Sequence, residues 1–429
     1  MLHVKKIFGK ALLINIRLFG YAYDYYLNEL EFCELAKSSD ISVVASFVYK
    51  LNQTYLNPKY LIGQGKLYNI LNKAKEEAID LVIFNYELSA SQQKNLEEFL
   101  NCKVLDRTEL ILHIFAKRAR TFEGKLQVEL ATLQHLSTRL VRVWTHLERQ
   151  RGGVGLRGGP GEQQLEIDRR IIKTRIKSIT KKLEKIQQQR HLHRSVRRKS
   201  RLLTVSLVGY TNSGKSTLFN RLTNANVTTL NMPFATLDLT VRSVLIPKVG
   251  QVILTDTVGF IRDLPHHLIA AFKATLEEIV YSDLLLHVID FSDNESIERR
   301  QHVLKVLQQI GASQVPILEV YNKIDQNLDM LKDGFSNYYG VKISALYGLG
   351  IDELKDAISD ALDLESMNFQ LKLMPINANI RVEFKKLDAI KKEEIDLVSG
   401  QFKLEINITK QAWEILCNKY VDLPKMVIK

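Results

Sequence analysis

The stretch that most constrains the fold is the sequence GYTNSGKS at positions 209–216. It follows the apolar run TVSLV and precedes TLFNRLTN, which has a helical pattern, so it lies in the strand–loop–helix context that a P-loop requires. Its glycines allow a tight turn whose amides point at a phosphate group, and the N-terminus of the following helix adds positive potential. The sequence therefore predicts an α/β domain that binds nucleotide phosphates.

Each P-loop position has an expected role. We expect Lys215 to neutralise phosphate charge and the Ser216 hydroxyl to bind magnesium. Asn212 has two equally good interpretations, as a ligand of a monovalent cation such as potassium or as a brace for the loop. The predicted phosphate-binding residues are Gly209, Tyr210, Thr211, Asn212, Ser213, Gly214, Lys215, Ser216 and Thr217.

Three further polar motifs follow, each at the end of an apolar run. In the first, DTVG, Asp256 is placed to hold magnesium through a water molecule, and Gly259 is placed to offer its amide to a γ-phosphate. In the second, NKID, the Asp325 carboxylate only accepts hydrogen bonds and so matches the N–H and amino donors of guanine, which adenine lacks. The third, SAL, supplies a backbone amide for the guanine oxygen. The predicted nucleotide contacts are Asp256, Thr257, Val258, Gly259, Asn322, Lys323, Ile324, Asp325, Ser344, Ala345 and Leu346.

The stretch PFATLD, between the P-loop and Asp256, shows neither a helical nor a strand pattern. We predict Thr236 as the second protein ligand of magnesium, ordered only when a γ-phosphate is present. Without the surrounding motifs, an ordinary connection would be an equally good interpretation. Nucleotide contacts are predicted here for Phe234, Ala235, Thr236, Leu237 and Asp238, and the predicted catalytic residues are Lys215, Thr236 and Gly259.

Phe260 follows Gly259, at the position where many GTPases carry a glutamine that orients the attacking water. A phenylalanine side chain cannot hydrogen-bond to water, so we predict weak intrinsic hydrolysis that a partner stimulates.

The positive charge of the chain is concentrated in one segment. The net charge is +12, but residues 111–201 carry 23 Lys and Arg against 7 Asp and Glu, so the remainder is slightly acidic. Two helical seams with mostly three- and four-residue spacing flank the glycine-rich stretch 152–161, which predicts a long antiparallel helical hairpin with a basic tip. A solvated helix surface is the alternative interpretation. We favour nucleic acid, above all RNA, as the partner, with Arg149, Arg151 and Arg157 as predicted contacts. The seam residues are Leu126, Leu130, Leu133, Leu140, Trp144 and Leu147, then Leu165, Ile172, Ile176, Ile179, Leu183 and Ile186.

Strand-like and helix-like runs alternate in two other parts of the chain, and alternation of this kind predicts mostly parallel sheets covered by helices. The predicted class is α/β. We expect an N-terminal α/β domain at 1–110, the hairpin at 111–201, a nucleotide-binding domain with a mixed, mostly parallel sheet at 202–365, and a small α+β appendage at 371–429. NIRVEFK and FKLEINI are the basis for the appendage, and LESMNFQ is the predicted linker before it.

Three distant cysteines, Cys33, Cys102 and Cys417, predict neither a disulfide framework nor a zinc site. The apolar runs fall short of a membrane span, so we expect a cytoplasmic protein with no membrane partner.

Several segments outside the nucleotide motifs resemble the HflX family of translational GTPases. They are LIGQGKL (61–67), ELSASQQKNLE (87–97), the stretch from VLDRTEL to LATLQ (104–134) and RGGPGEQQLEIDRR (157–170). FATLD and DTVGFIRDLP also match the switch segments of the family, and Gln163 is a departure where the family usually has threonine.

The resemblance implies a magnesium-dependent GTPase that converts GTP to GDP and phosphate. It also implies binding to the large ribosomal subunit, with the hairpin reaching ribosomal RNA, and a role in splitting or rescuing stalled ribosomes or in ribosome biogenesis. We expect a monomer that is partly ribosome-associated. The alternative is a non-enzymatic RNA-binding scaffold on the ribosome, in which GTP only stabilises the fold. The resemblance further implies adenine-nucleotide binding by the N-terminal domain, but GQGK (63–66) is better interpreted as a structural turn.

Overall fold

The structure is a computed structural model of the 429-residue chain. It describes residues 9–18, 25–52, 56–149, 160–199, 202–224, 232–262, 265, 268, 271–293, 295–326, 340–362, 366–396, 400–420 and 422–428. The chain forms two compact units. The first comprises Met1–Gln188, Leu230–Asp238 and Asp263–Ala274, and the second comprises Gln189–Thr229, Leu239–Arg262 and Thr275–Lys429.

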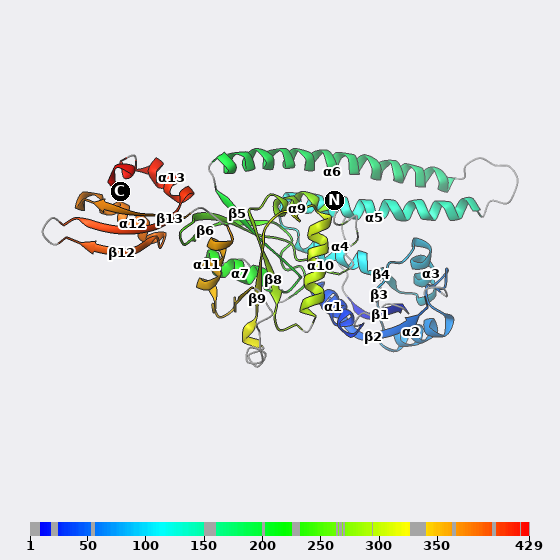
Figure 1. Ribbon diagram of the computed structural model, residues 1–429. Coiled ribbons are helices and arrows are strands. Elements are labelled where there is room, and N and C mark those ends of the chain that lie inside the picture. The colour runs from blue at the N-terminus through cyan, green and yellow to red at the C-terminus, as the bar shows by residue number, and fades with distance from the viewer. Residues whose placement is uncertain are drawn as a thin grey trace. The chain divides into compact units, whose positions relative to one another are not determined.

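A parallel sheet with strand order β2-β1-β3-β4 forms the centre of the N-terminal α/β fold (Figure 1). The short strand β3 is buried along its whole length, as expected for a parallel strand covered on both faces. GQGK at 63–66 opens a helix, with Gly63 at its N-cap position. The elements are β1 (Lys10–Leu18), α1 (Tyr25–Ser38), β2 (Ser42–Leu51), α2 (Gln64–Glu76), β3 (Leu81–Phe84), α3 (Ala90–Leu100), β4 (Lys103–Asp106) and α4 (Arg107–Arg118).

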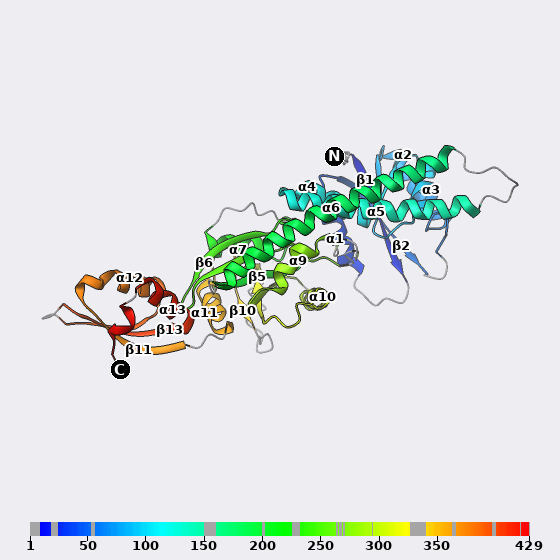
Figure 2. The same ribbon diagram turned by 90° about the horizontal axis from the view of Figure 1, so that it is seen from above.

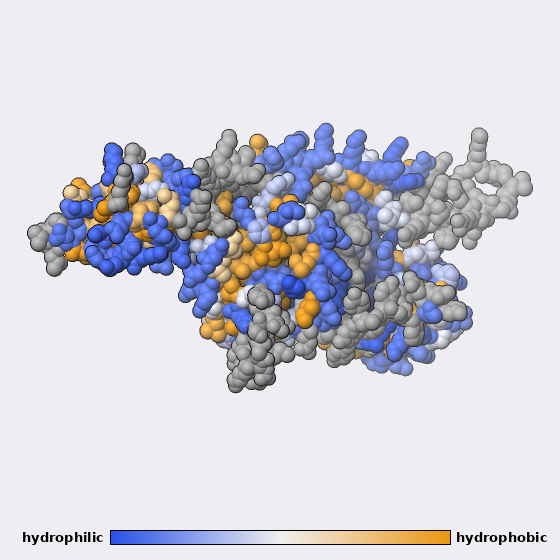
Figure 3. Space-filling view, in the orientation of Figure 1, coloured by the Kyte–Doolittle hydropathy of each residue, from blue (hydrophilic) through white to orange (hydrophobic). Residues whose placement is uncertain are grey.

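The hairpin consists of α5 (Phe122–Arg149) and α6 (Pro160–Lys199), which lie side by side in both ribbon views (Figures 1 and 2). Polar side chains cover the outer side of α6 (Figure 3). The predicted seams do meet, through Leu126, Leu130, Leu133, Ile172, Ile176, Ile179, Leu183 and Ile186. The side chains of Leu140, Trp144, Leu147 and Leu165 lie outside the described residues, as do residues 152–159 of the predicted tip.

The nucleotide-binding domain has the strand order β10-β9-β8-β5-β7-β6, in which all neighbours are parallel except β6 and β7. Helices α7 and α11 pack on the same apolar cluster as the strands. The sequence pattern did not predict β6, and β10 comprises only two residues. The elements are β5 (Leu203–Gly209), α7 (Lys215–Thr223), β6 (Thr240–Ile246), β7 (Gly250–Asp256), α9 (Lys273–Val280), β8 (Leu284–Asp290), α10 (Ser296–Gln309), β9 (Ile317–Asn322), η2 (Ile324–Gln326), β10 (Val341–Lys342) and α11 (Ile351–Ala361).

The C-terminal part is an antiparallel sheet with strand order β12-β13-β11-β14 and two helices, in the β-α-β-β-α-β sequence of a ferredoxin-like fold. NIRVEFK forms helix α12 and FKLEINI forms strand β13. The predicted linker is wrong in part, because β11 already begins at Ser366 and its alternating Phe369, Leu371 and Leu373 pack into the core. The elements are β11 (Ser366–Leu373), η5 (Pro375–Asn377), α12 (Ala378–Lys386), β12 (Ile390–Ile395), β13 (Phe402–Thr409), α13 (Lys410–Lys419), η6 (Leu423–Met426) and β14 (Val427–Ile428).

Within the described part of the chain, no helix combines the length and the apolar character that crossing a bilayer demands.

Candidate functional site

Two glycines of the P-loop are required by close backbone approaches. Gly209 has φ +151°, and a Cβ there would lie 2.3 Å from the Val288 carbonyl oxygen. Gly214 has φ +93°, and its Cβ would lie 2.1 Å from the Asn322 amide nitrogen. The loop therefore packs directly against the carboxyl ends of β8 and β9, and side chains at these positions would displace it.

Lys215 is the first residue of α7 and is buried. Its Nζ donates hydrogen bonds to the carbonyl oxygens of Gly209 (3.1 Å) and Tyr210 (2.6 Å). Burial lowers the pKa of Lys215 to about 8, although the nearby Asp256 carboxylate acts in the opposite direction. The ammonium group thus lies inside the loop, where the phosphates of a nucleotide would stabilise its charged form.

Ser216 and Asp256 meet across α7 and β7. The Ser216 hydroxyl donates to Asp256 Oδ2 at 2.7 Å, and Asp256 is fully buried at the end of its strand. A hydroxyl and a carboxylate are hard oxygen donors of the kind magnesium prefers, so this pair fits the ion expected from the sequence.

Backbone hydrogen bonds join the DTVG segment to the P-loop. Thr211 N donates to Phe260 O at 2.8 Å, and Phe260 N donates to Gly209 O at 3.1 Å. The Phe260 ring is buried. A Cβ on Gly259 would lie 3.0 Å from Lys215 Nζ and 2.9 Å from Thr211 Cα. Glycine is therefore required at 259, and the side chain that follows it packs in the interior.

Asn322 connects three of the predicted motifs. Its amide nitrogen donates to Ser213 O at 2.9 Å, and its amide oxygen accepts from Ala345 N at 2.9 Å. The Asn322 side chain is buried, which strengthens the case for a fixed bracing role. The P-loop, NKID and SAL segments are consequently held by one side chain.

The remaining NKID residues lie at the same edge of the sheet. Lys323 Nζ forms an ion pair with Asp290 Oδ2 at 2.6 Å, and Ser344 Oγ donates to Asp325 Oδ1 at 2.5 Å. Leu346 is exposed, and Arg221 donates hydrogen bonds to the backbone carbonyl oxygens of Ala345 and Leu346. Sequence reasoning missed Asp290 and Arg221. The position of Asp290, at the end of the apolar run LLLHVI, was the available signal.

The segment that contains Thr236 belongs to the first compact unit, together with the N-terminal fold and α5. Within this unit, Phe234 is buried against Phe115 of α4, and Asp238 contacts the residues just before α5. Thr236 is partly buried between them. The other predicted nucleotide and magnesium residues all lie in the second unit.

The comparisons with known proteins cover most of the chain. Residues 25–116 match a family described as GTP-binding GTPase N-terminal, residues 118–197 match GTP-binding GTPase Middle Region, and residues 204–323 match 50S ribosome-binding GTPase. GTPase HflX from Escherichia coli K12 is 48% identical over 367 residues, which is 85% of this chain and 86% of that protein. GTPase HflX from Magnetococcus marinus is 46% identical over 349 residues, 81% of this chain and 80% of that one.

The chain belongs to the HflX family of GTPases. It is therefore a GTP hydrolase that binds guanine nucleotides, in agreement with the sequence motifs. Among solved structures, a GTP-binding protein from Sulfolobus solfataricus in complex with GDP is 29% identical, with a TM-score of 0.43, over 82% of this chain and 99% of that one.

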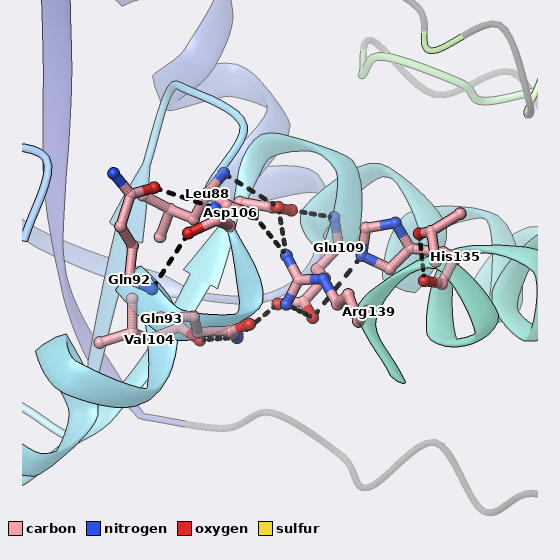
Figure 4. Close-up of polar contacts among 10 residues, drawn as sticks. Leu88, Gln92, Gln93, Val104, Asp106, Glu109, His135 and Arg139 are labelled. Carbon is pink, nitrogen blue, oxygen red and sulfur yellow. Dashed lines mark hydrogen bonds and ion pairs between the residues drawn. The ribbon is translucent and has the colours of Figure 1, made fainter. Parts of the chain in front are cut away.

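In this HflX-family chain, a buried polar network fastens the hairpin to the N-terminal fold (Figure 4). Arg139 of α5 contacts Asp106 Oδ2 at 2.5 Å and Glu109 Oε1 at 2.8 Å. Asp106 also caps α4 by accepting from Glu109 N at 2.8 Å. His135 Nε2 lies 3.8 Å from Glu109 Oε1. The middle of α5 is thus held by Asp106 and Glu109 at the start of α4.

The network shifts the pKa values of its two carboxyl groups in opposite directions. Burial and the Glu109 carboxylate raise the pKa of Asp106, against the lowering effect of Arg139. Burial acts to raise the pKa of Glu109 too, but the nearby His135 and Arg139 hold it below its ordinary value. Glu109 is therefore the more firmly ionised partner of Arg139.

The structure does not test the predicted RNA contacts. Arg149 ends α5, but its side chain is outside the described residues, as are Arg151 and Arg157 entirely. No group of three or more His, Cys, Asp or Glu side chains suited to a metal ion occurs among the described residues.

Proposed function

We propose that this GTPase is a magnesium-dependent switch that binds the large ribosomal subunit through its basic hairpin and is released when GTP is hydrolysed. The concentration of positive charge on residues 111–201, in a chain whose remainder is slightly acidic, is the observation that carries the proposal. The middle and GTPase segments that match the family models span this hairpin and the P-loop, and the description 50S ribosome-binding GTPase supports the choice of partner.

The nucleotide would be held by the motifs that Asn322 ties together. Lys215 and the P-loop amides bind the phosphates. Asp325 accepts two hydrogen bonds from guanine, and a backbone amide of the SAL segment donates to the guanine oxygen. Ser216 and Thr236 would bind magnesium directly, and Asp256 would bind it through water. Magnesium, when bound, neutralises charge on the β- and γ-phosphates.

Hydrolysis without a partner should be slow. The Phe260 ring is buried and its backbone is paired with the P-loop, so this residue offers no polar side-chain group to the attacking water. We infer that the ribosomal subunit supplies or orders the missing group. In the cell the protein would be cytoplasmic and partly ribosome-associated, acting as a monomer that splits or rescues stalled ribosomes or serves their biogenesis.

The test is GTP turnover with purified large subunits, small subunits or neither. Large subunits should raise the turnover number, whereas small subunits should not. Replacement of Arg149, Arg151 and Arg157 by glutamate should weaken subunit binding and lower the salt dependence, by about 0.7–0.9 in log–log slope for each lost phosphate contact. A control with the same charge change replaces the exposed Lys75, Lys372 and Lys403. Turnover unchanged by large subunits would contradict the proposal.

The variant Lys215→Ala distinguishes the GTP-dependent switch from the non-enzymatic scaffold. A switch loses its nucleotide-dependent effect on ribosomes with this variant, whereas a scaffold that remains folded retains it. Sedimentation of intact ribosomes with GTP and with a non-hydrolysable analogue then shows whether the subunits separate.

A further inference from the structure

Asp238 is bound at the beginning of the hairpin helix α5. Its Oδ2 accepts from Arg120 N at 2.7 Å and from Thr121 N at 2.9 Å, and its Oδ1 accepts from Thr121 Oγ1 at 2.6 Å. The same Thr121 Oγ1 accepts from Gly124 N at 3.0 Å, so Thr121 caps α5. Asp238 thus holds the capping residue from a segment that is remote in sequence, and its negative charge suits a helix N-terminus.

This contact explains why position 124 is a glycine. It lies in the first turn of α5, where glycine is a poorer helix former than alanine. A Cβ at this position would lie 2.2 Å from Asp238 Oδ1. The Asp238 carboxylate therefore occupies the space that any other residue at 124 would need.

The other end of the segment is anchored by Phe234. Its ring is buried, 4.7 Å from the Phe115 ring of α4, and Phe115 also packs on Phe272 at 5.0 Å. Phe234 has φ +55°, a backbone conformation that is unfavourable for a bulky residue. Packing, and not local preference, keeps the chain in this conformation, as expected for a restrained segment.

Thr236 lies two residues from each anchor. On the other side of Asp238, Thr240 begins β6 and pairs in register with Asp256, the residue expected to hold magnesium through water. Thr240 follows Thr236 by only four positions, so movement of Thr236 towards a magnesium-bound nucleotide acts directly on Asp238. Asp238 therefore lies between Thr236 and the start of β6 in the sequence.

We propose that Asp238 is a positioning residue that restrains Thr236 by binding the start of α5, and that GTP loosens this contact when Thr236 moves to magnesium. The state of the nucleotide is then transmitted to the base of the basic hairpin. The proposal rests on the proposed function only in taking Thr236 as a magnesium ligand, and it requires no ribosome for its test.

Two substitutions break the contact from opposite sides. Asp238→Ala removes the acceptor, and Gly124→Ala expels the carboxylate while leaving every nucleotide motif unchanged. Gly65→Ala, in helix α2, is the matched control, because nothing lies within 4 Å of its added Cβ. Asp238→Asn keeps an acceptor but loses the charge, and it should restore part of the wild-type behaviour. Circular dichroism and thermal unfolding verify that each variant folds.

Basal GTP turnover without ribosomes is the first measurement. Both variants should raise kcat about fivefold or more, which is the lower range of allosteric coupling, and the double variant should add nothing further. They should also increase the affinity for a GTP analogue relative to GDP. A purely structural role for Asp238 would lower stability without changing this ratio.

Hydrogen exchange at the Arg120 and Thr121 amides is the second measurement, since both donate to Asp238. In the wild type these amides should exchange faster with the GTP analogue than with GDP, and in both variants they should exchange fast with either nucleotide. Unchanged turnover in folded Gly124→Ala and Asp238→Ala proteins overturns the proposal. Equal exchange rates of the Arg120 and Thr121 amides with GDP and with the GTP analogue in the wild type also overturn it. Thr236→Ala distinguishes failure of this proposal from failure of the proposed function. Normal turnover in that variant would disprove the magnesium-ligand role of Thr236 itself.

Discussion

At the scale of single residues, the nucleotide site depends on a few side chains that hold loops together. Asn322 spans the P-loop and the SAL segment, and Asp325 is held by Ser344 Oγ at 2.5 Å. That hydroxyl occupies part of the capacity of Oδ1 and fixes the carboxylate plane. Base selection is therefore expected to depend on the chemistry of Asp325 more than on the shape of its surroundings.

Asp325→Asn should exchange guanine for xanthine as the preferred base. The amide group that this substitution introduces cannot accept from both guanine donors, but its NH₂ can donate to the oxygen that xanthine carries at the same place. GTP affinity should fall about 10²-fold or more, and xanthosine triphosphate should bind better than GTP. Competition with a fluorescent nucleotide measures both. Asp352→Asn, whose side chain is almost fully exposed, is the control, and equal losses for the two variants would contradict this role.

At the scale of elements, the hairpin shows which contacts the apolar spacing predicts and which it does not. The three- and four-residue spacing predicted two helices and the residues of their contact, and the apolar cluster between α5 and α6 contains those seam residues whose side chains the structure describes. The spacing did not predict the polar attachment of α5 to α4. In the sequence, Arg139 cannot be distinguished from an ordinary solvent-facing position of an amphipathic helix. Only the fold brings Arg139 into contact with Asp106, at 2.5 Å, and with Glu109, at 2.8 Å.

Arg139→Ala should destabilise the N-terminal fold and hairpin strongly. Arg139 is mostly buried and Asp106 is fully buried, so the substitution leaves two carboxylates without their partner and should cost about 3 kcal/mol or more. Arg175→Ala breaks a half-exposed pair with Glu129 on the same hairpin and should cost less than about 1 kcal/mol. Urea unfolding in a Trp413→Phe background, where Trp144 is the sole tryptophan, follows this part of the chain. Similar midpoints for the two variants would disagree with the buried network.

At the scale of the whole molecule, the C-terminal fold has its own apolar core, and its four strands pair only with one another. It meets the turn between β6 and β7 through two backbone hydrogen bonds, from Lys248 N to Leu387 O and from Thr409 N to Lys248 O. Neither bond involves a nucleotide motif. The GTPase sheet is therefore complete without this part.

Removal of residues 363–429 should leave nucleotide binding and basal hydrolysis within about twofold of the full chain, because separate sites without shared partners contribute independently. Isothermal titration with GDP and a phosphate-release assay measure the two quantities. Loss of nucleotide binding in a truncated protein with normal secondary structure would show that the C-terminal fold supports the site after all.

The sequence by itself determined the elements whose patterns are local. The P-loop, the positions of DTVG, NKID and SAL at strand ends, the parallel sheets and the hairpin seams all follow from short-range spacing. Short segments with mixed patterns were less predictable: β6 was not predicted, and β11 begins inside the expected linker. In both, the pairing of strands decides the structure, and pairing depends on residues that are distant in sequence.

The tertiary structure alone decided which residues meet. Asn322 braces the P-loop across 109 positions, and Asp238 reaches the start of α5 across 117. A carboxylate at position 238 has no local signature of helix capping, because its partner is brought to it only by the folded chain. Sequence specifies chemistry at each position, whereas the restraint on Thr236 arises from packing between segments that have no pattern in common.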